Sequence, residues 1–317
     1  MVDALSKRPE VELLVNVPDQ GDILHAHTFG TAYVRRRSQY PGRRIMTAHV
    51  IPDSLKGSLI GWQLWLPVAE RMMRIAYNSV DIVLAVAPHV KEDLKRIGVE
   101  TRIEVLTNPV NEARFYVDPA FRVEGRKRLG LAEDAKVALC VGQIQPRKGV
   151  AEFIETARLC PDVTFVWLGG RPFGGLTADV KGLDAKIAAA TANVHFPGTV
   201  KLEEMPLYYS AADILFFPSW QENCALAINE AMACGVPLLL KDNPEYPALY
   251  GADNYLKASD PQGFAWQIQA FFNDDALRNK LHDASLHVAK SFSVTTYADF
   301  LVKLYQELMA NKPALAS

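Results

Sequence analysis

Short apolar runs alternate with amphipathic segments along most of this 317-residue chain. In the second half, segments of helical periodicity separate apolar runs that are continuous enough to be buried on both faces of a sheet. The predicted strands are 137–143, 163–170, 193–198, 213–219 and 236–242, and the predicted helices are 150–160, 178–191, 201–211 and 224–234. Buried strands joined by helices predict a parallel, doubly wound α/β sheet.

The first half repeats this pattern more weakly. Its predicted strands are 12–17, 22–27, 44–49, 81–87 and 102–107, and its predicted helices lie near 29–37, 67–79 and 88–97. A parallel α/β domain usually opens with a strand followed by a glycine-rich turn. This sequence instead opens in a helix-like segment, so we expect a first domain without its opening strand.

The length of the chain favours two domains. We place the first Rossmann-like domain at 1–112 and the second at 136–292. Residues 113–135 contain two glycines, a proline, many charges and no good strand, which predicts the connection between the domains. Residues 293–317 hold a final helix, whose apolar stripe is formed by Tyr297, Phe300, Leu301, Leu304 and Leu308.

Composition excludes several classes of protein. The chain is 49% hydrophobic and 22% charged, as globular proteins are, and its net charge of −2 argues against nucleic acid as a partner. Its four cysteines lack metal-ligand spacing, which predicts reduced, buried thiols in a cytoplasmic protein. No apolar run approaches the roughly 20 residues of a membrane span, and the first residues do not resemble a signal peptide.

Four loops of unusual composition follow predicted strands of the second half. They are GQIQPRKG (142–149), GGRPFG (169–174), PGTV (197–200) and PSWQENCA (218–225). Because ligands bind beyond the carboxyl ends of parallel strands, we expect these loops to converge on one site. In the first loop, Gly142 and Gly149 flank Arg147 and Lys148, a combination suited to a diphosphate. The alternative is an ordinary turn with a solvated pair of cations.

The fourth loop places Glu222 just before the helix predicted at 224–234. The small residues at 223–225 leave the first N–H groups of that helix open to a phosphate. On a regular helix, Glu230 would return to within about 80° of the face of Glu222. Two carboxylates so placed suit pairs of sugar hydroxyls, because each carboxylate accepts two hydrogen bonds. The alternative for Glu222 is a charge at the helix N-terminus that the helix dipole favours, and the alternative for Glu230 is an ordinary surface glutamate.

Three histidines lie in or at the ends of predicted strands of the first half. His25 and His27 alternate along one strand and should share a face, and His49 follows the next strand. No third ligand with zinc spacing accompanies them, so we expect no metal site. No GxSxG motif occurs, and Cys224 has no identified base, so a nucleophilic triad finds no support.

Residues 28–80 are basic within an almost neutral chain. Eight Lys and Arg residues against Asp53 and Glu70 give this segment a charge of +6. Cations beside interfacial tryptophans favour binding to an anionic membrane surface. The residues assigned to that surface are Arg35, Arg36, Arg37, Lys56, Trp62 and Trp65. The alternative places the tryptophans in the core, and Val68, Met72, Ile75 and Ala76 are expected there in either case.

Taken together, these motifs resemble glycosyltransferase family 4, whose members have the GT-B fold of two Rossmann-like domains facing across a cleft. VGQIQPRKGV looks like the glycine- and lysine-bearing loop of the family, and PSWQENCALAINEAMACGVP carries its Glu-x7-Glu signature. Within the family, TAHVIPDSLKGS (47–58) looks most like bacterial enzymes that glucosylate diacylglycerol for glycolipid and lipoteichoic-acid anchors. In this fold the final helix crosses back to the first domain.

The resemblance also implies roles for individual residues. Lys148 would bind the diphosphate of a UDP-sugar, Glu230 its ribose and Glu222 the hydroxyls of the transferred sugar, with His49 against that sugar. The backbone from Asn223 to Leu226 would cap the phosphates. The residues assigned to the donor are Gly142, Gln143, Arg147, Lys148, Gly169, Asn223, Cys224, Ala225, Leu226 and Glu230, and those assigned to catalysis are His49 and Glu222.

Two of these positions depart from the family pattern. Gln143 stands where the family has arginine, and Asn-Cys-Ala follows Glu222 where Gly-Phe-Gly is commoner. The implied reaction is transfer with retention at the anomeric carbon, assisted by the leaving phosphate and without a metal or other cofactor. The expected location is the cytoplasmic face of the membrane. A soluble acceptor, or a catalytically silent UDP-binding module, remains an alternative.

Overall fold

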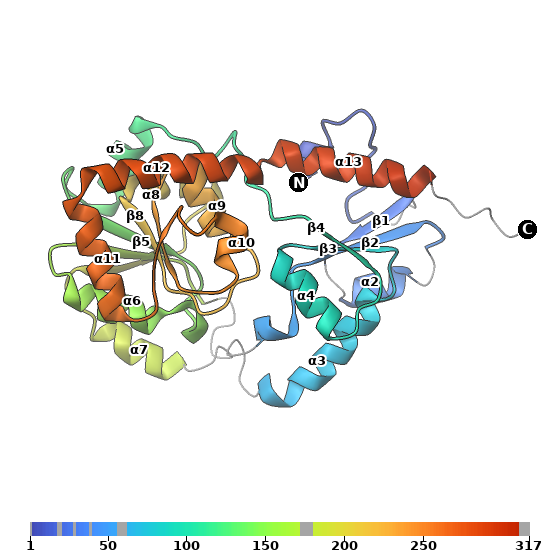
Figure 1. Cartoon of the computed structure of the whole chain (residues 1–317), viewed down its shortest axis with the longest axis horizontal. Helices are drawn as coiled ribbons and strands as arrows, with labels where there is room; N and C mark the ends of the chain where they lie inside the picture. Colours follow the sequence, from blue (N-terminus) through green and yellow to red (C-terminus); the bar gives the residue numbers. More distant parts are fainter. Residues whose placement is uncertain are drawn as a thin grey trace, which may run out of the picture. The chain divides into compact units, whose positions relative to one another are not determined.

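The structure is a computed structural model that describes residues 2–17, 21–27, 30–37, 40–55, 62–171 and 180–310. The chain divides into two compact units, each built on one parallel sheet (Figure 1). Unit 1 comprises residues 1–54, 63–109 and 292–317, and unit 2 comprises residues 55–62 and 110–291. The fold predicted from the alternation of strands and helices is therefore confirmed.

Unit 1 contains a four-stranded sheet in the order β1-β2-β3-β4, with all neighbouring strands parallel. Its elements are α1 (Val2–Leu5), β1 (Ile23–Ala26), α2 (Thr31–Arg37), β2 (Arg43–Ala48), η1 (Pro52–Leu55), α3 (Trp62–Tyr77), β3 (Ile82–Ala85), α4 (Pro88–Arg96), β4 (Arg102–Val105), and α13 (Val294–Ala310). The predicted strand at 12–17 is wrong. Within the described part of the chain, residues 11–15 join no ladder, and both Leu14 and Val15 are exposed.

The final helix α13 covers one face of this sheet. Its buried residues Leu301, Leu304 and Leu308 belong to one apolar cluster with Ile45 of β2 and Leu84 of β3. The predicted apolar stripe is confirmed, since four of its five residues are buried and Phe300 is partly buried against the same cluster. Because α13 supplies much of this core, the last helix is part of unit 1 rather than an appendage.

Unit 2 contains a six-stranded parallel sheet in the order β10-β9-β8-β5-β6-β7. Its elements are α5 (Pro119–Leu129), β5 (Val137–Val141), η2 (Pro146–Lys148), α6 (Val150–Leu159), β6 (Thr164–Leu168), α7 (Val180–Ala188), β7 (Val194–Gly198), η4 (Leu202–Glu204), α8 (Met205–Ala211), β8 (Ile214–Phe217), α9 (Leu226–Ala233), β9 (Leu238–Lys241), α10 (Tyr246–Tyr250), β10 (Leu256–Ala258), α11 (Pro261–Asn273), and α12 (Asp275–Ala289), followed by η5 (Lys290–Phe292).

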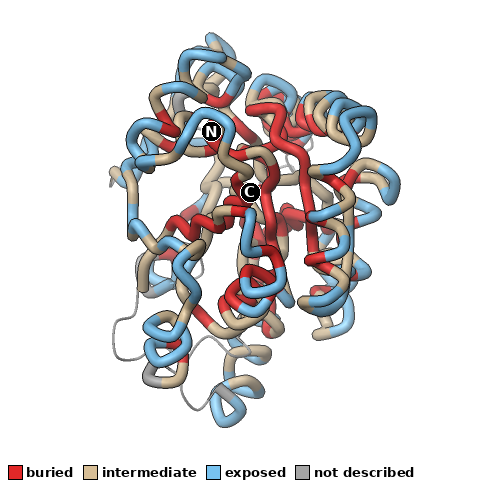
Figure 2. The backbone as a smooth tube through the Cα atoms, turned by 90° about the vertical axis from the view of Figure 1, so that its left-hand side faces the viewer, coloured by how far each residue is buried: buried red, intermediate tan, exposed pale blue. Residues whose placement is uncertain are grey.

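Helices cover both faces of this sheet. Contacts group α6, α7 and α11 on one face, and α5, α8, α9 and α12 on the other. Figure 2 shows the buried residues gathered along the strands and the inner sides of the helices. The strand order reverses direction at β5, so the loops after β5 and β8 meet at the topological switch point, where α/β sheets bind ligands. All four cysteines are buried and free, as predicted.

The segment predicted as an interdomain connection contains a helix of unit 2. Asp118 caps α5 by accepting a hydrogen bond from the N–H of Ala120, and Gly130 ends it in the left-handed region. A Cβ on Gly125 would lie 2.0 Å from the carbonyl oxygen of Leu207, so the two helices α5 and α8 approach closely. The helix buries this glycine and the charged Arg126 instead of an apolar stripe, which is why hydrophobic periodicity did not reveal it.

Candidate active site

Two loops of unit 2 are fastened to one another at the carboxyl ends of β5 and β8. The N–H of Trp220 donates to the carbonyl of Arg147 at 2.8 Å, and Arg147 Nη1 donates to the carbonyl of Gln221 at 3.2 Å. Gly149 has φ +79°, and a Cβ there would lie 2.3 Å from the oxygen of Pro218. Glycine is required at this position both by the backbone conformation and by the contact. The expected convergence of the first and fourth loops is confirmed.

An ion pair lies at the centre of these two loops. Lys148 Nζ donates to Glu222 Oε1 at 2.5 Å, and Ser219 Oγ donates to the same oxygen at 2.6 Å. The two charged side chains are only 13% and 9% exposed. Asn243 Nδ2 in turn donates to the carbonyl of Ser219 at 3.0 Å. The pair is thus held in place by hydrogen bonds from the next loop along the sheet.

Sequence reasoning missed Ser219 and Asn243. Ser219 lies inside the quoted motif, so its position next to Glu222 offered a signal. Asn243 follows β9 and carries no motif, and only the fold places it here.

Gly142, Gln143 and Gly169 border a cavity of about 440 Å³ beside the ion pair. Gly169 has φ +144°, and a Cβ there would lie 1.9 Å from the carbonyl oxygen of Gly142. That same oxygen accepts a hydrogen bond from Trp167 Nε1 at 2.9 Å. The remaining walls come from Val141, Leu168, Gly170, Arg171, Thr199, Val200 and Met205. Residues 172–174 of the second loop lie outside the described residues.

Helix α9 begins two residues later than predicted, at Leu226, and the side chain of Ala225 at its N-cap position makes no capping hydrogen bond. Cys224 is buried, and its Sγ accepts a hydrogen bond from Asn229 at 3.8 Å. Asn223 Oδ1 accepts one from Gln221 at 2.8 Å. Because these side chains bond within the protein, an anion at this helix start would be bound by backbone N–H groups.

Glu222 and Glu230 lie on different elements and have different hydrogen-bond partners. Glu222 precedes α9 and lies in a loop, so the predicted sharing of a helix face is wrong. Glu230 lies on α9, and Tyr209 of α8 donates a hydrogen bond to its Oε2 at 2.7 Å. In the described part of the chain, no contact joins Glu230 to Lys148 or Glu222. Tyr209 carried no sequence signal, because only the packing of α8 beside α9 brings it there.

Burial perturbs the acidity of Glu230. It raises the pKa of the carboxyl from 4.5 to about 7, while the hydrogen bond from Tyr209 and the charge of Arg114 act in the opposite direction. A buried carboxyl with this pKa changes charge near neutral pH. Such a group binds hydroxyl donors best in its ionised form.

The three histidines of unit 1 form one stack. The rings of His25 and His27 lie 4.7 Å apart, and His27 Nδ1 lies 3.0 Å from His49 Nε2. His25 also contacts Thr47 and Tyr305 through its two nitrogens. The predicted common face is confirmed. Burial lowers the pKa of His25 to about 3 and of His27 to about 4, and it also lowers that of His49. Neutral rings are therefore expected at pH 7.

No group of three or more metal-ligating side chains with suitable geometry occurs among the residues that the structure describes.

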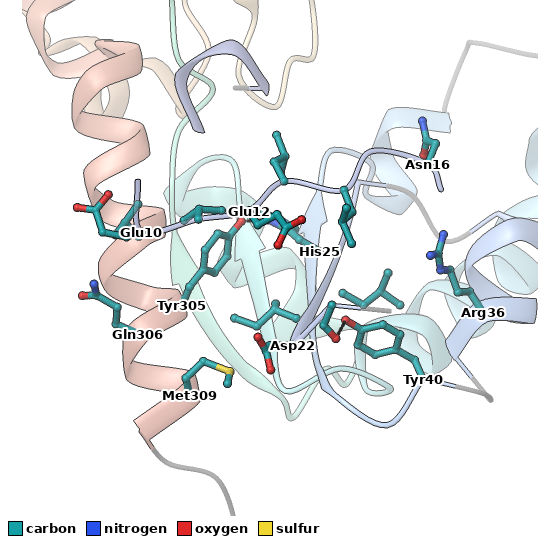
Figure 3. A pocket seen from close by; sticks show the side chains of 17 residues that line it. Glu10, Glu12, Asn16, Asp22, His25, Arg36, Tyr40, Tyr305, Gln306 and Met309 are labelled. Carbon is teal, nitrogen blue, oxygen red and sulfur yellow. Dashed lines mark hydrogen bonds between the residues drawn. The ribbon is translucent and has the colours of Figure 1, made fainter. Parts of the chain in front are cut away.

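A second cavity, of about 350 Å³, lies in unit 1 between residues 10–16, β1 and α13 (Figure 3). Of the residues assigned to a site from the sequence, only Arg36 lines it among the described positions. Tyr40 donates to the carbonyl of Gly21 at 2.5 Å on its wall. His25 of the histidine stack also lines this cavity.

Helix α3 exposes an apolar stripe. Leu64, Trp65, Val68, Met72 and Ile75 are between 51 and 82% exposed, and their spacing places them on one helical face. The expectation that Val68, Met72 and Ile75 belong to the core is wrong, whereas Ala76 is buried as predicted. The alternative that placed the tryptophans in the core is wrong for Trp65.

Basic side chains accompany this stripe. Arg71 and Arg74 are exposed on the same helix, and Arg35, Arg36 and Arg37 form the last turn of α2. Lys56 and the side chain of Trp62 lie outside the described residues. Among the described helices, none is long and apolar enough to cross a membrane.

Comparisons with known proteins match both halves of the chain. A family model for glycosyl transferases group 1 matches residues 122–287, and a model for glycosyltransferase family 4 matches residues 13–114. The chain is 28% identical to alpha-galactosylglucosyldiacylglycerol synthase of Streptococcus pneumoniae, over 98% of this chain and 84% of that protein. It is 24% identical to a processive diacylglycerol alpha-glucosyltransferase of Acholeplasma laidlawii, over 95% and 90%.

Solved structures of low sequence identity share the fold. Sucrose-phosphate synthase from Thermosynechococcus elongatus superposes with a TM-score of 0.80 at 21% identity, over 92% of this chain and 74% of that one. Anabaena HepE, solved in complex with UDP and glucose, gives 0.76 at 21% identity, over 90% and 77%.

Proposed function

The chain belongs to the glycosyl transferases of group 1, and on that premise we propose that it transfers a hexose from a UDP-sugar to a diacylglycerol-type lipid. The proposal extends to retention at the anomeric carbon and to a role in glycolipid or lipoteichoic-acid anchor synthesis. The residues that we assign to the donor are those of unit 2, and His49 of unit 1 is assigned to the transferred sugar.

The observation that carries this proposal is the paired Lys148 and Glu222. Their 2.5 Å contact joins a cation and a carboxylate at the switch point of the sheet, and both side chains are almost buried. A diphosphate beside Lys148 would share its ammonium group with Glu222, and a carboxylate can accept hydrogen bonds from sugar hydroxyls as well. One contact thus supplies the two kinds of group that a sugar diphosphate requires.

The remaining donor contacts would lie next to this pair, on the side of the nucleoside. The 440 Å³ cavity beside Gly142 and Gly169 has room for a nucleobase, and Glu230 offers a carboxylate to the ribose. During transfer, negative charge develops on the departing diphosphate. Lys148 and the N–H groups at the start of α9 would stabilise that charge, while the phosphate accepts the proton of the incoming hydroxyl. Because Lys148 supplies the positive charge, we propose that no metal ion is needed.

The acceptor is proposed from two independent observations. The two relatives described above are named for diacylglycerol-based lipids. In addition, the exposed apolar stripe of α3, flanked by arginines, suits an anionic lipid surface, where each nearby cation contributes about 1 kcal/mol. We therefore propose that the protein lies at a membrane surface, and its free, buried cysteines favour the cytoplasmic side.

Activity is tested with labelled UDP-glucose and vesicles that contain diacylglycerol. A labelled glycolipid is expected, and its anomeric configuration by NMR reports retention or inversion. Undiminished activity in EDTA is expected if no metal takes part. Binding of UDP without transfer to any lipid would instead indicate a silent nucleotide-binding module, and transfer only to water-soluble glycans would indicate a soluble acceptor.

Membrane binding is tested separately by sedimentation with anionic vesicles. Replacing Trp65 and Val68 of α3 by serine should reduce the bound fraction severalfold, because two exposed apolar contacts are lost. Val123 on α5 of unit 2 is 67% exposed, and Val123→Ser is the matched control. Equal binding of all three proteins would remove α3 from the proposed membrane surface.

A further inference from the structure

Trp220 is an exposed aromatic residue that is held in a fixed position next to the ion pair. It is 54% exposed, yet its backbone N–H donates to Arg147 at 2.8 Å and its indole Nε1 donates to Glu152 Oε1 at 2.7 Å. Lys241 Nζ lies 5.8 Å from the centroid of its ring, within range of a cation–π contact. Holding an exposed side chain in one position adds little to the stability of the fold, so the fixed position of Trp220 suits a residue that binds a ligand.

Trp220 lies at one side of the ion pair along the order of the strands. The strand order is β10-β9-β8-β5-β6-β7. The 440 Å³ cavity lies over β5, β6 and β7, and the Lys148–Glu222 pair follows β5 and β8. Trp220 comes after β8 and reaches toward Lys241, the last residue of β9. Trp220 is thus bonded to the loop after β5 and to the first turn of α6, and it also reaches toward β9, whereas the cavity extends toward β7.

This order matches the order of groups in the reaction. A nucleotide in the cavity places its diphosphate at Lys148 and its sugar at Glu222, and the acceptor must approach the sugar from beyond it. The contacts of Trp220 also indicate which kind of ligand its ring can bind. Its single polar group is already bonded to Glu152, and Lys241 lies over the ring, so a ligand at the exposed part of this side chain would meet an apolar surface. The C–H face of a pyranose ring fits such a surface, because it buries apolar area while its hydroxyls stay hydrated.

We propose that Trp220 is a stacking platform for the sugar ring of an already glycosylated lipid acceptor. The inference rests on the proposed function, since it concerns the acceptor of the same reaction. It makes Trp220 a residue that distinguishes a hexosyl-diacylglycerol from diacylglycerol itself. The exposed Trp266 on α11 offers a matched comparison, because it is 65% exposed and, among the described residues, no hydrogen bond or ring contact fixes it.

The test compares Trp220→Ala, Trp220→Phe and the control Trp266→Ala in the full chain. Acceptors are diacylglycerol and glucosyl-diacylglycerol, each presented in detergent micelles so that vesicle binding plays no part. For Trp220→Ala we expect the KM for glucosyl-diacylglycerol to rise about tenfold, with the KM for UDP-glucose, the UDP affinity and the KM for diacylglycerol unchanged. Trp220→Phe should retain most of the wild-type KM, and Trp266→Ala should behave as wild type.

Several results would overturn the inference. An unchanged KM for glucosyl-diacylglycerol in Trp220→Ala would do so, as would a raised KM for UDP-glucose, which would assign the ring to the donor. Equal losses with both lipids would assign the ring to the diacylglycerol part that the two acceptors share.

A binding experiment separates this inference from the proposed function. Saturation-transfer NMR with octyl glucoside below its micellar concentration reports sugar contact without any transfer. If the wild type transfers nothing to lipid, the proposed function fails. A sugar signal that is lost in Trp220→Ala and kept in Trp266→Ala still supports the platform, and a signal that both variants keep rejects it.

Discussion

Glu230 provides the sharpest test of the donor site, because its burial makes a charged carboxylate unfavourable in the free protein. We consider Glu230→Gln, which keeps the shape of the side chain and removes the ionisation. Burial raises the pKa of this carboxyl from 4.5 to about 7. Below pH 4.5 the group is protonated in both folded and unfolded chains, so it makes no difference to stability. Between pH 4.5 and pH 7 the unfolded chain ionises this group while the folded chain keeps it protonated, so wild type loses about 3 kcal/mol that the glutamine variant keeps.

Ligand binding should show the opposite effect. If ribose hydroxyls donate to the carboxylate, UDP binds the ionised form. The ionised fraction rises about tenfold between pH 6 and pH 8, and the UDP affinity of wild type should rise by a similar factor. Glu230→Gln should bind UDP more weakly at pH 8 and lose this added pH dependence. The titration of UDP itself remains in both proteins, so their difference isolates Glu230.

The assays are calorimetric unfolding and UDP titration at pH 5, 6, 7 and 8. Glu203→Gln changes an exposed glutamate of η4 and serves as the control. The reasoning is refuted if Glu230→Gln is less stable than wild type at pH 8. It is also refuted if the two proteins bind UDP with the same pH profile.

Three further predictions address the site and the fold. Lys148→Ala should weaken UDP binding about tenfold or more, because it removes a charge-assisted contact with the diphosphate. Titration calorimetry measures this affinity, with Glu222→Gln as the comparison, and an unchanged affinity in Lys148→Ala would contradict the proposed site. Gly149→Ala should also lower UDP affinity, because its Cβ would lie 2.3 Å from the oxygen of Pro218, and wild-type binding would contradict the close approach of the loops. Asp213→Asn should destabilise unit 2 by about 3 kcal/mol, because the side chain of Arg126, only 4% exposed, loses the carboxylate that pairs with it. A thermal unfolding midpoint equal to that of wild type would refute a stabilising role for this ion pair.

The sequence by itself determined the architecture and the chemistry of the candidate site. Short apolar runs predicted nine of the ten strands in the described part of the chain. The signal is continuous where a strand is fully buried, as in β3 and β8, and weaker where it is only partly buried, as in β1 and β7. The loops after β5 and β8 were identified because glycine, lysine and glutamate gather there, directly after predicted strands. Their meeting followed from the rule that the carboxyl ends of parallel strands share an edge.

Tertiary structure decided which of these groups hold one another and which apolar residues are buried. Glu222 and Glu230 are eight residues apart in sequence, yet one is held by Lys148 and Ser219 and the other by Tyr209. On α3, residues with the spacing of a core face are exposed. Periodicity shows that a helix has an apolar side, but only the packing of other elements determines whether anything covers it.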